Sequence, residues 1–581
     1  MKMNLYDGMI RYSDEKPVFN GGVLAEDREG GVSVMFCGSF YNLQEMAPDC
    51  SSPAEAILRY YRKDGNLSFL CDVDGAFAVV VHDSRKKRLL AARDRLGTMP
   101  MFYFHNNDGF YFAHTLSKLQ ENSAMPREVD LQGLHDYLAL QYVPCPGTLY
   151  RDVWKMLPGS VLTIPFDTKL LRFDSYWSPD FSKIDRNISI DDAAARLREL
   201  LDDSVRRRIP AGGNYAALLS GGLDSTIITG VVARHTAQPL PTLTVGFDSP
   251  DYDERDRAEF AVNTINREVG HPLDHRVRVI QADNFQLLEE LVKAYGEPYA
   301  DASLLPTYMV CRWAKEENMT VAFNGDAADE LFGGYERYLV MRYAEHFKLV
   351  PRWMFKAGAG ILPKGGNERS AVGRLLRTCR AMSVKPAERY LNIVSRFDEE
   401  QRRAIYGERF DDIVLARTSR IISEAEEQVS GHGLVEKLQE IDMRTYMPGD
   451  VLPKAVIASQ TVPIDGIAPF LENKIMDFAM TLPTEFKQNG SSRKHLLKVA
   501  YPEFVPPRIA GQRKKGFGVP VGEWLRGSWH ELMCAHLLEG NLVKEGYFKK
   551  AGLEEMIGRH QRREADLTYP LWSLMVLDLF L

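Results

Sequence analysis

The feature that most constrains the fold is an apolar run that ends in a glycine-rich turn and continues into a helical pattern. Residues 216–219 read Ala-Ala-Leu-Leu, which is typical of a buried strand, and residues 220–226 follow as Ser-Gly-Gly-Leu-Asp-Ser-Thr. Glycine lets the backbone approach an anion closely, and the first turn of a helix presents unpaired N–H groups at the positive end of its dipole. The segment therefore predicts a strand–loop–helix phosphate site. A plain glycine-rich turn is the alternative.

The side chains of this loop fit the same chemistry. Ser220 and Ser225 can add hydroxyl donors to a phosphate, and Asp224 is placed to hold Mg²⁺ against it. The spacing differs from the GxxxxGK pattern of P-loop kinases and GTPases, which excludes those enzymes.

The pattern around the loop predicts an α/β domain with a helical extension. A helix is expected over 193–208, a strand over 215–219, a helix from 225 and a strand over 240–246, an order that implies a parallel sheet with crossover helices. Residues 337–447 are rich in Arg, Glu, Leu and Ala and carry few strand signals, so we expect helices there.

The amino-terminal part is different in pattern. Short strand-like runs at 32–36, 75–81 and 89–92 are separated by Gly, Asp and Asn turns, which predicts a sheet-rich domain. A polar stretch without period follows. We therefore expect a first domain over 1–177, a linker over 178–190 and a second domain over 191–581.

Composition narrows the choice of partners and compartment. The 72 basic and 79 acidic residues of the 581-residue chain give a net charge of −7, which leaves no overall electrostatic footprint for nucleic acid or an anionic membrane. The seven cysteines are scattered and never spaced CxxC, and no segment reads as a signal peptide or a membrane span. We expect a cytoplasmic protein with neither nucleic acid nor membrane as a partner.

A second acidic turn follows the apolar run 321–323. Residues 324–335 include Asp326, Asp329 and Glu330, three carboxylates that are costly to hold together unless a cation or a substrate ammonium neutralises them. Asp329 is the expected second Mg²⁺ ligand. A solvated acidic turn is the alternative.

Farther on, residues 512–520 read Gln-Arg-Lys-Lys-Gly-Phe-Gly-Val-Pro. A lysine in this segment could neutralise the negative charge that develops when an adenylate is attacked. A solvent-facing lysine pair is the alternative.

Together these segments resemble the asparagine synthetase superfamily, whose synthetase half carries SGGLDS, SGDGGDELFGGY and RPKMGFGVP-like motifs. Residues 244–247 resemble its adenine-side strand, and 469–472 resemble its PFLD turn. The resemblance implies ATP and Mg²⁺ as cofactors, metal ligands at Asp224 and Asp329, and catalytic roles for Asp326 and Lys514. It implies nucleotide contacts from Ser220, Gly221, Gly222, Leu223, Asp224, Ser225, Thr226, Val245, Gly246 and Gly325.

The same resemblance extends to the amino-terminal glutaminase half through 40–42, 74–78 and 92–97. The implied fold is an α+β, Ntn-hydrolase-like β-sandwich followed by an α/β parallel-sheet ATP-pyrophosphatase domain of the adenine nucleotide alpha hydrolase type. The family's glutaminase needs a cysteine after Met1, but this chain begins Met-Lys-Met-Asn, and Cys37-Gly38-Ser39 stands where the family has Asn-Gly-Glu. The family's SDTE segment is Ser-Pro-Ala-Glu at 52–55. We expect the fold without glutamine hydrolysis.

The synthetase half also differs from the family's usual sequence at one place. Where the family commonly reads LVKVDRASM, residues 452–460 replace the Asp-Arg pair by Val456-Ile457. These two branched hydrocarbon side chains should make the wall of the substrate site apolar. Such a wall is unsuited to a small zwitterion such as aspartate.

The chain combines an intact synthetase half with a glutaminase half that lacks the cysteine after Met1. This combination resembles lasso-peptide macrocyclases and β-lactam synthetases. Both adenylate a carboxylate that an amine of the same substrate then attacks, a step helped by a large effective concentration. We expect an ATP-dependent, AMP-forming amide ligase for a carboxylate substrate bearing an amine, with a peptide as one candidate and a precursor peptide or biosynthetic proteins as partners. Asp326 favours the macrocyclase branch, because the β-lactam branch has a tyrosine there. An asparagine synthetase using free ammonia and a non-catalytic scaffold are the alternatives.

Overall fold

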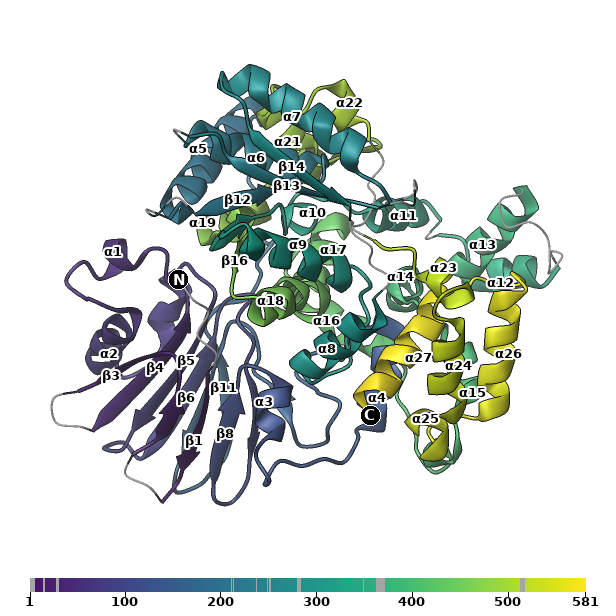
Figure 1. Ribbon diagram of the computed structural model, residues 1–581, viewed down its shortest axis with the longest axis horizontal. Helices are drawn as coiled ribbons and strands as arrows, with labels where there is room; N and C mark the ends of the chain where they lie inside the picture. The colour runs from purple at the N-terminus through teal and green to yellow at the C-terminus, as the bar shows by residue number, and fades with distance from the viewer. Residues whose placement is uncertain are drawn as a thin grey trace.

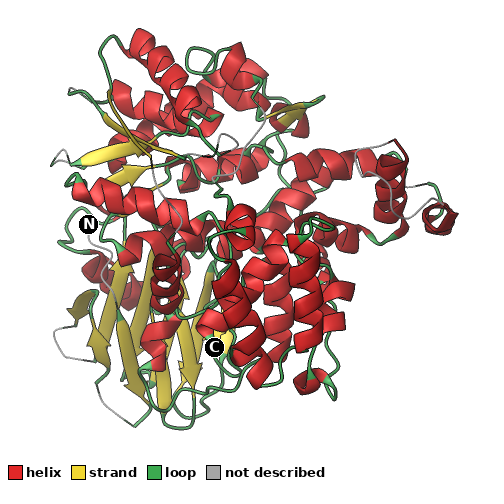
Figure 2. Ribbon diagram, turned by 45° about the vertical axis from the view of Figure 1, so that its right-hand side comes forward, coloured by secondary structure: helices red, strands yellow, loops and turns green. Residues whose placement is uncertain are grey.

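The computed structural model describes residues 6–13, 16–27, 31–210, 212, 214–236, 238–247, 249, 252–279, 284–347, 349–361, 371–512 and 518–581. An amino-terminal body of strands lies beside a larger body in which a parallel sheet and many helices gather (Figure 1). In the turned view the strands of the amino-terminal body lie together at the lower left, and helices dominate the rest of the molecule (Figure 2).

The amino-terminal body is a sandwich of two antiparallel sheets. The first has the order β2-β1-β8-β7-β9, with β1 Asp7–Arg11, β2 Val18–Asn20, β7 Phe102–His105, β8 Gly109–Ala113 and β9 Trp154–Lys155. The second has the order β11-β10-β6-β5-β4-β3, with β3 Val23–Glu26, β4 Val32–Gly38, β5 Phe77–Asp83, β6 Arg88–Arg93, β10 Ser160–Pro165 and β11 Arg172–Ser175. The strands expected at 32–36, 75–81 and 89–92 are confirmed as β4, β5 and β6.

The side chains of β5 point alternately to the two faces of its sheet, and each face packs against a different layer of this body. Val80 packs into the cluster between the two sheets, whereas Val79 and Val81 pack on the other face with α2 (Pro53–Asp64). Because side chains alternate along a strand, a run that is buried on both faces reads as continuously apolar. The fold is therefore the expected Ntn-hydrolase-like sandwich. Its smaller helices are α1 Leu43–Met46, α3 Leu116–Gln120 and α4 Leu131–Leu140.

The segment between β11 and α5 (Ile190–Arg208) contains neither helix nor strand, and it packs on the second body. Phe181 is buried, its backbone N–H donates to Ser430 Oγ at 2.8 Å, and the Asp185 N–H donates to the Thr481 carbonyl at 2.8 Å.

The second body is built on a five-stranded parallel sheet of order β14-β13-β12-β15-β16. Its strands are β12 Tyr215–Leu218, β13 Pro241–Gly246, β14 Asp274–Val279, β15 Val321–Phe323 and β16 Asp465–Ile467, and α5, α6 (Leu223–Arg234) and α7 (Arg255–Val269) accompany it. The α/β prediction is confirmed. The helix after the loop begins two residues earlier than expected, since Gly222 is its extended N-cap.

Helices dominate the rest of the chain. The expected extension contains α11 Glu336–Glu345, α12 Arg352–Ile361, α13 Ala371–Ser383, α14 Pro386–Val394, α15 Glu399–Ile405, α16 Ser419–Glu427 and α17 Leu434–Arg444, and the described part of 337–447 has no strand. Other helices that enter the argument are α8 Phe285–Tyr295, α9 Leu304–Glu316, α10 Ala328–Leu331, α18 Leu452–Thr461, α19 Asn473–Thr481, α21 His495–Ala500, α26 Lys550–Gln561 and α27 Thr568–Phe580. Among the described residues no helix has the length and hydropathy to cross a membrane.

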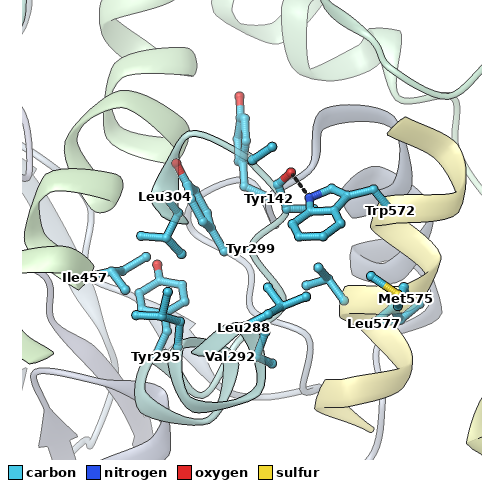
Figure 3. Close-up of a cluster of buried hydrophobic side chains, with 14 of the residues drawn as sticks. Tyr142, Leu288, Val292, Tyr295, Tyr299, Leu304, Ile457, Trp572, Met575 and Leu577 are labelled. Carbon is cyan, nitrogen blue, oxygen red and sulfur yellow. Dashed lines mark hydrogen bonds between the residues drawn. The ribbon is translucent and has the colours of Figure 1, made fainter. Parts of the chain in front are cut away.

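A large apolar cluster connects the two bodies. Figure 3 shows Tyr295, Tyr299 and Ile457 facing Trp572, whose indole N–H donates to the Ala300 carbonyl at 2.9 Å. The hydroxyl of Tyr137, on α4 of the amino-terminal body, donates to the Ser573 carbonyl at 2.8 Å. Shared core of this kind should hold the two bodies in one arrangement.

Candidate functional site

The glycine loop lies between β12 and α6 at the carboxyl edge of the parallel sheet. Gly221 has φ +71°, and a Cβ there would lie 2.3 Å from the carbonyl carbon of Arg257, so only glycine fits without movement of α7. The Thr226 hydroxyl donates to the Gly222 carbonyl at 2.7 Å, and the hydroxyls of Ser220 and Ser225 are 3.0 Å apart. The whole predicted phosphate segment thus lies in one turn and the first turn of a helix, the arrangement that binds anions.

The acidic turn lies next to this loop because β15 pairs in parallel with β12. Parallel strands present their carboxyl ends at the same edge, where ligand sites form in such sheets. A Cβ on Gly325 would lie 2.8 Å from the Asp224 Cβ, which places the two turns in contact. Asp329 follows on α10, and it is largely buried.

Lys494 joins the two turns, and the sequence analysis did not identify it. Its Nζ lies 2.5 Å from Asp224 Oδ2 and 2.7 Å from Asp329 Oδ1. Burial lowers the pKa of this lysine, but the attraction of Asp224 and Asp329 outweighs burial and raises the pKa. Lys494 is the N-cap of α21 with φ 52°, and the chain gives no other local signal for its role.

Gly334 makes room for this arrangement. A Cβ at that position would lie 1.9 Å from Asp329 Oδ1 and 2.2 Å from the Cε of Lys494. The second glycine of the Phe-Gly-Gly-Tyr segment is therefore required by close packing against the ion pair.

The predicted magnesium ligands fit a metal bound to phosphate. Asp224 and Asp329 converge on one ammonium, so their oxygens lie close together, and carboxylate oxygens are the ligands that Mg²⁺ prefers. Among the described residues, no group of three or more His, Cys, Asp or Glu side chains is arranged to hold a metal ion on its own. Two protein carboxylates still suit Mg²⁺, which usually completes its shell with water and substrate phosphate oxygens.

A second charged cluster lies around Lys454 on α18. Its Nζ is 3.7 Å from Asp301 Oδ2, and burial lowers its pKa while Asp301, Asp326, Asp450 and Glu330 together raise it. Burial, followed by repulsion from Asp301, raises the pKa of Asp450 to about 7. Burial and the charge of Asp326 raise the pKa of the Cys311 thiol to about 12. The charges of four carboxylates therefore act on this one lysine.

Buried polar contacts fix the acidic turn to the helical extension. The Tyr335 hydroxyl donates to the Glu330 carboxylate, and Gln439 Nε2 donates to the Leu331 carbonyl at 2.9 Å. The Arg337 guanidinium lies 3.6 Å from the Tyr335 ring centroid and 4.5 Å from that of Tyr446, and it pairs with Asp442 at 2.7 Å. These contacts hold the backbone of Glu330 in place, which preorganises the turn.

The remaining predicted site residues fall into two groups. Val245 and Gly246 end β13, next to β12, and the Thr244 hydroxyl ties the strand to the loop by donating to the Leu219 carbonyl at 2.5 Å. They lie at the same sheet edge as the glycine loop. Lys514 lies outside the described residues, so its predicted catalytic role stays a prediction.

Val456 and Ile457 lie at the interface between the bodies. Ile457 is buried beside Tyr295 in the core (Figure 3), and Val456 lines a cavity together with Cys145 and Lys155 of the amino-terminal body. The pair therefore makes this interface apolar. The expected exclusion of aspartate from a substrate wall stays a prediction.

In the glutaminase-like body, Cys37, which stands where the family has the asparagine of Asn-Gly-Glu, is packed among apolar side chains. Burial raises the pKa of Cys37 to about 12, and Cys37 shares a buried cluster with Tyr6, Met99 and Met101. The Tyr6 hydroxyl donates to the Pro100 carbonyl at 2.5 Å. At 52–55, Ser52 caps α2 and Glu55 accepts from the Ser51 N–H at 2.8 Å, so this segment serves as a helix cap.

Residues 196–581 match the family described as asparagine synthase, which is more than half of the chain. The chain belongs to the asparagine synthase family. Residues 25–177 match a glutamine amidotransferase domain. The glutamine-hydrolyzing asparagine synthetase 1 of Bacillus subtilis is 28% identical over 578 residues, which cover 96% of this chain and 87% of that protein.

Two further relatives have similar coverage. A putative glutamine-hydrolyzing asparagine synthetase of Mycobacterium bovis is 29% identical over 568 residues, covering 94% of this chain and 84% of its own length. The amidase chry2 of Gibberella zeae is 21% identical over 581 residues, covering 93% and 84%. Membership in the asparagine synthase family makes this protein an ATP-dependent carbon–nitrogen ligase that forms AMP and pyrophosphate.

Proposed function

We propose that this member of the asparagine synthase family adenylates the carboxylate of a substrate that carries its own amine, and that this amine closes an amide ring. The observation that carries the proposal is the group of carboxylates that act on Lys454. Asp301, Asp326, Asp450 and Glu330 make this part of the site acidic, and an acidic site is suited to bind the ammonium group of a substrate.

The chain's own residues support the first half of this reaction. The N–H groups at the start of α6 and the hydroxyls of Ser220 and Ser225 would donate to the ATP phosphates. Asp224 and Asp329 would hold Mg²⁺, which when bound neutralises phosphate charge and orients the α-phosphate. Lys494, which lies between both carboxylates, would then turn toward the pyrophosphate that leaves.

The second half needs a base for the attacking amine. Asp326 is the candidate, because it acts on the same Lys454 as the rest of the acidic cluster. Asp450 has a pKa of about 7, which suits a group that accepts a proton near neutral pH. Lys514 is proposed to stabilise the oxyanion of the tetrahedral intermediate. The aspartate at position 326 favours closure of the macrocyclase type over the β-lactam type.

The amino-terminal body is proposed to have no glutaminase activity. A buried Cys37 thiol with a raised pKa is a poor nucleophile, and it lies in one apolar cluster with Tyr6 and Met99. Incubation of the purified protein with glutamine should therefore release no glutamate, with or without Mg²⁺-ATP. Iodoacetamide should label the half-exposed Cys71 and Cys534 of the native protein before Cys37. Glutamate release that is lost in Cys37→Ala would contradict this part of the proposal.

The ligase proposal is tested by pyrophosphate release with Mg²⁺-ATP. We expect release with peptides that have a free amino terminus and an internal carboxylate. We expect none with aspartate plus ammonium. Asp301→Asn should raise KM for the amine-bearing substrate, because it removes one of the carboxylates around Lys454. Release with aspartate and ammonium would identify an asparagine synthetase that uses free ammonia. Absence of release with every substrate, together with absence of ATP binding, would favour a non-catalytic scaffold.

A further inference from the structure

The segment that contains α12 and α13 has a local excess of basic residues. Residues 347–385 contain nine basic side chains and one acidic side chain, Glu368, whereas the whole chain has a net charge of −7. Four of these basic side chains, Arg352, Lys356, Arg380 and Lys385, are among the described ones, and all four are exposed. We expected no membrane partner from the net charge of the whole chain. That net charge does not reveal a local excess of basic residues.

Large apolar side chains are exposed in the same segment, the α12–α13 hairpin. Trp353 is 69% exposed, Ile361 84% and Leu349 89%, and Met354 is half exposed. Soluble proteins rarely expose several such side chains together unless they bind something. α12 and α13 lie at the outer edge of the helical part in Figure 1, away from the strands.

The residues of α12 are arranged in stripes. Trp353, Ala357 and Ile361 are four residues apart and exposed, so they form one outward face. Arg352 and Lys356 form a neighbouring exposed stripe. The half-buried Phe355 and Gly358 lie on the opposite side, where a Cβ on Gly358 would be 3.3 Å from Cys379 Sγ of α13. The apolar outward face is therefore not used for packing within the described chain.

We propose that α12, together with Leu349, binds the surface of an anionic phospholipid bilayer. An amphipathic helix with an aromatic and aliphatic face beside lysines and arginines lies in the interface between headgroups and acyl chains. Lysine and arginine near such a surface are attracted to anionic lipid headgroups, and tryptophan is favoured at headgroup depth.

The charges and the apolar face together disfavour nucleic acid and a second copy of the chain as occupants. Nucleic acid would pair with the basic side chains, but it offers no apolar environment for Leu349 and Ile361. A second copy of the hairpin would bring two strongly positive surfaces together, which is unfavourable. The lipid surface satisfies both the charge and the apolar face. α11 connects the hairpin to the acidic turn, since its N-cap is Tyr335.

The test uses the full-length protein and sedimentation with vesicles. Vesicles of phosphatidylcholine mixed with phosphatidylglycerol should bind the protein, vesicles of phosphatidylcholine alone should bind it weakly, and added salt should release it. Replacing Arg352 and Lys356 by glutamine should weaken binding to the mixed vesicles roughly 30-fold, at about one factor of five for each charge. Replacing Trp353 and Ile361 by serine should weaken it by at least about tenfold.

Matched variants control for the general effect of surface changes. Val414 is 99% exposed on another part of the helical extension, and Lys549 and Lys550 are exposed at the start of α26. Val414→Ser and the double change of Lys549 and Lys550 to glutamine should leave vesicle binding unchanged. Circular dichroism and the unfolding midpoint should show that all variants are folded.

Three outcomes would overturn the proposal. The first is no binding to mixed vesicles, and the second is binding that the hairpin variants share with the controls. The third is binding to duplex nucleic acid or to an acidic peptide that needs Arg352 and Lys356 but is indifferent to Trp353 and Ile361. None of these measurements depends on ligase activity.

Discussion

At the scale of single residues, Lys494 is the centre of the candidate site. Its ammonium holds Asp224 and Asp329 at 2.5 and 2.7 Å, and the three side chains are mostly buried. Removing one member of a buried ion pair leaves uncompensated charge, which is the costly case. This lysine therefore stabilises the site before any nucleotide binds.

Lys494→Ala is expected to lower the free energy of unfolding by about 3 kcal/mol, because two neighbouring carboxylates lose their cation. Mg²⁺ should restore part of the loss in this variant and less in the wild type, since it would neutralise the same two carboxylates. Urea denaturation with and without Mg²⁺ measures both effects. Lys498→Ala is the control: Lys498 lies on the same helix, and its Nζ donates to Ser492 Oγ at 3.2 Å. An equal cost for both variants would contradict the account.

Asp450 gives a pH dependence with a defined sign. Its pKa in the folded protein is about 7, against 3.8 for an ordinary aspartate, so the folded state binds more protons between those two values. The free energy of unfolding should therefore fall as pH rises from about 4 to about 7, by at most about 4 kcal/mol from this group.

Asp450→Asn should remove this contribution. The side-chain carbonyl that this substitution introduces would keep the hydrogen bond from the Tyr299 hydroxyl, which now reaches Asp450 Oδ1 at 2.9 Å. We expect the variant to be more stable than wild type above pH 7 and the difference to vanish near pH 4, as measured by urea denaturation across this range. The same change at Asp412, an exposed aspartate, should leave the pH profile unaltered. A variant that is less stable than wild type above pH 7 would refute the raised pKa.

At the scale of elements, the glycine loop is held by the approach of α7. Gly221 and Gly270 both have left-handed backbones, with φ +71° and +75°, but only Gly221 has backbone atoms within 3 Å of the position of a Cβ. Alanine at Gly270 should cost about 1 kcal/mol for the backbone alone. Alanine at Gly221 should cost about 2 kcal/mol more and weaken ATP binding, because α7 must move. Chemical denaturation and nucleotide titration compare the two, and equal costs would show that α7 does not constrain the loop.

The sequence predicted well those elements whose structure is determined by residues that are neighbours in the chain. The strand–loop–helix around 220–226 and the strands β4, β5 and β6 follow from apolar runs and glycine turns. Lys494 was missed because its partners are 270 and 165 positions away and no local pattern marks it. The position of Val456 and Ile457 at the interface could not be predicted from the sequence either. Which side of α18 contacts the amino-terminal body depends on how the two bodies pack.

At the scale of the whole molecule, a buried ion pair joins the two bodies. Arg208, at the end of α5, pairs with Asp74 of the amino-terminal body at 2.6 Å, and the Asn473 N–H donates to the same carboxylate at 3.2 Å. Both side chains of the pair are almost fully buried. A second, more exposed pair connects Arg95 with Asp477 at 2.8 Å. The first pair should matter far more for the arrangement of the bodies.

Asp74→Asn is expected to cost about 3 kcal/mol, because the buried Arg208 guanidinium keeps only the more distant Glu472 carboxylate, at 3.8 Å, as a counter-charge. Asp477→Asn should cost less than about 1 kcal/mol, as expected for an exposed pair. Thermal unfolding should show a lower midpoint for the first variant, with the two bodies unfolding in separate steps if the pair couples them. A similar midpoint for both variants would mean that the apolar interface, and not the ion pair, holds the bodies together.

The central claim is that an amine of the substrate itself attacks the adenylate. The measurement that tests it most directly is the mass of the product formed when the protein turns over Mg²⁺-ATP with an amine-bearing carboxylate in the presence of ¹⁵N-labelled ammonium. The account predicts a product lighter than the substrate by one water and free of ¹⁵N. A product that has gained labelled nitrogen would contradict it and would place this chain with the ammonia-using asparagine synthetases.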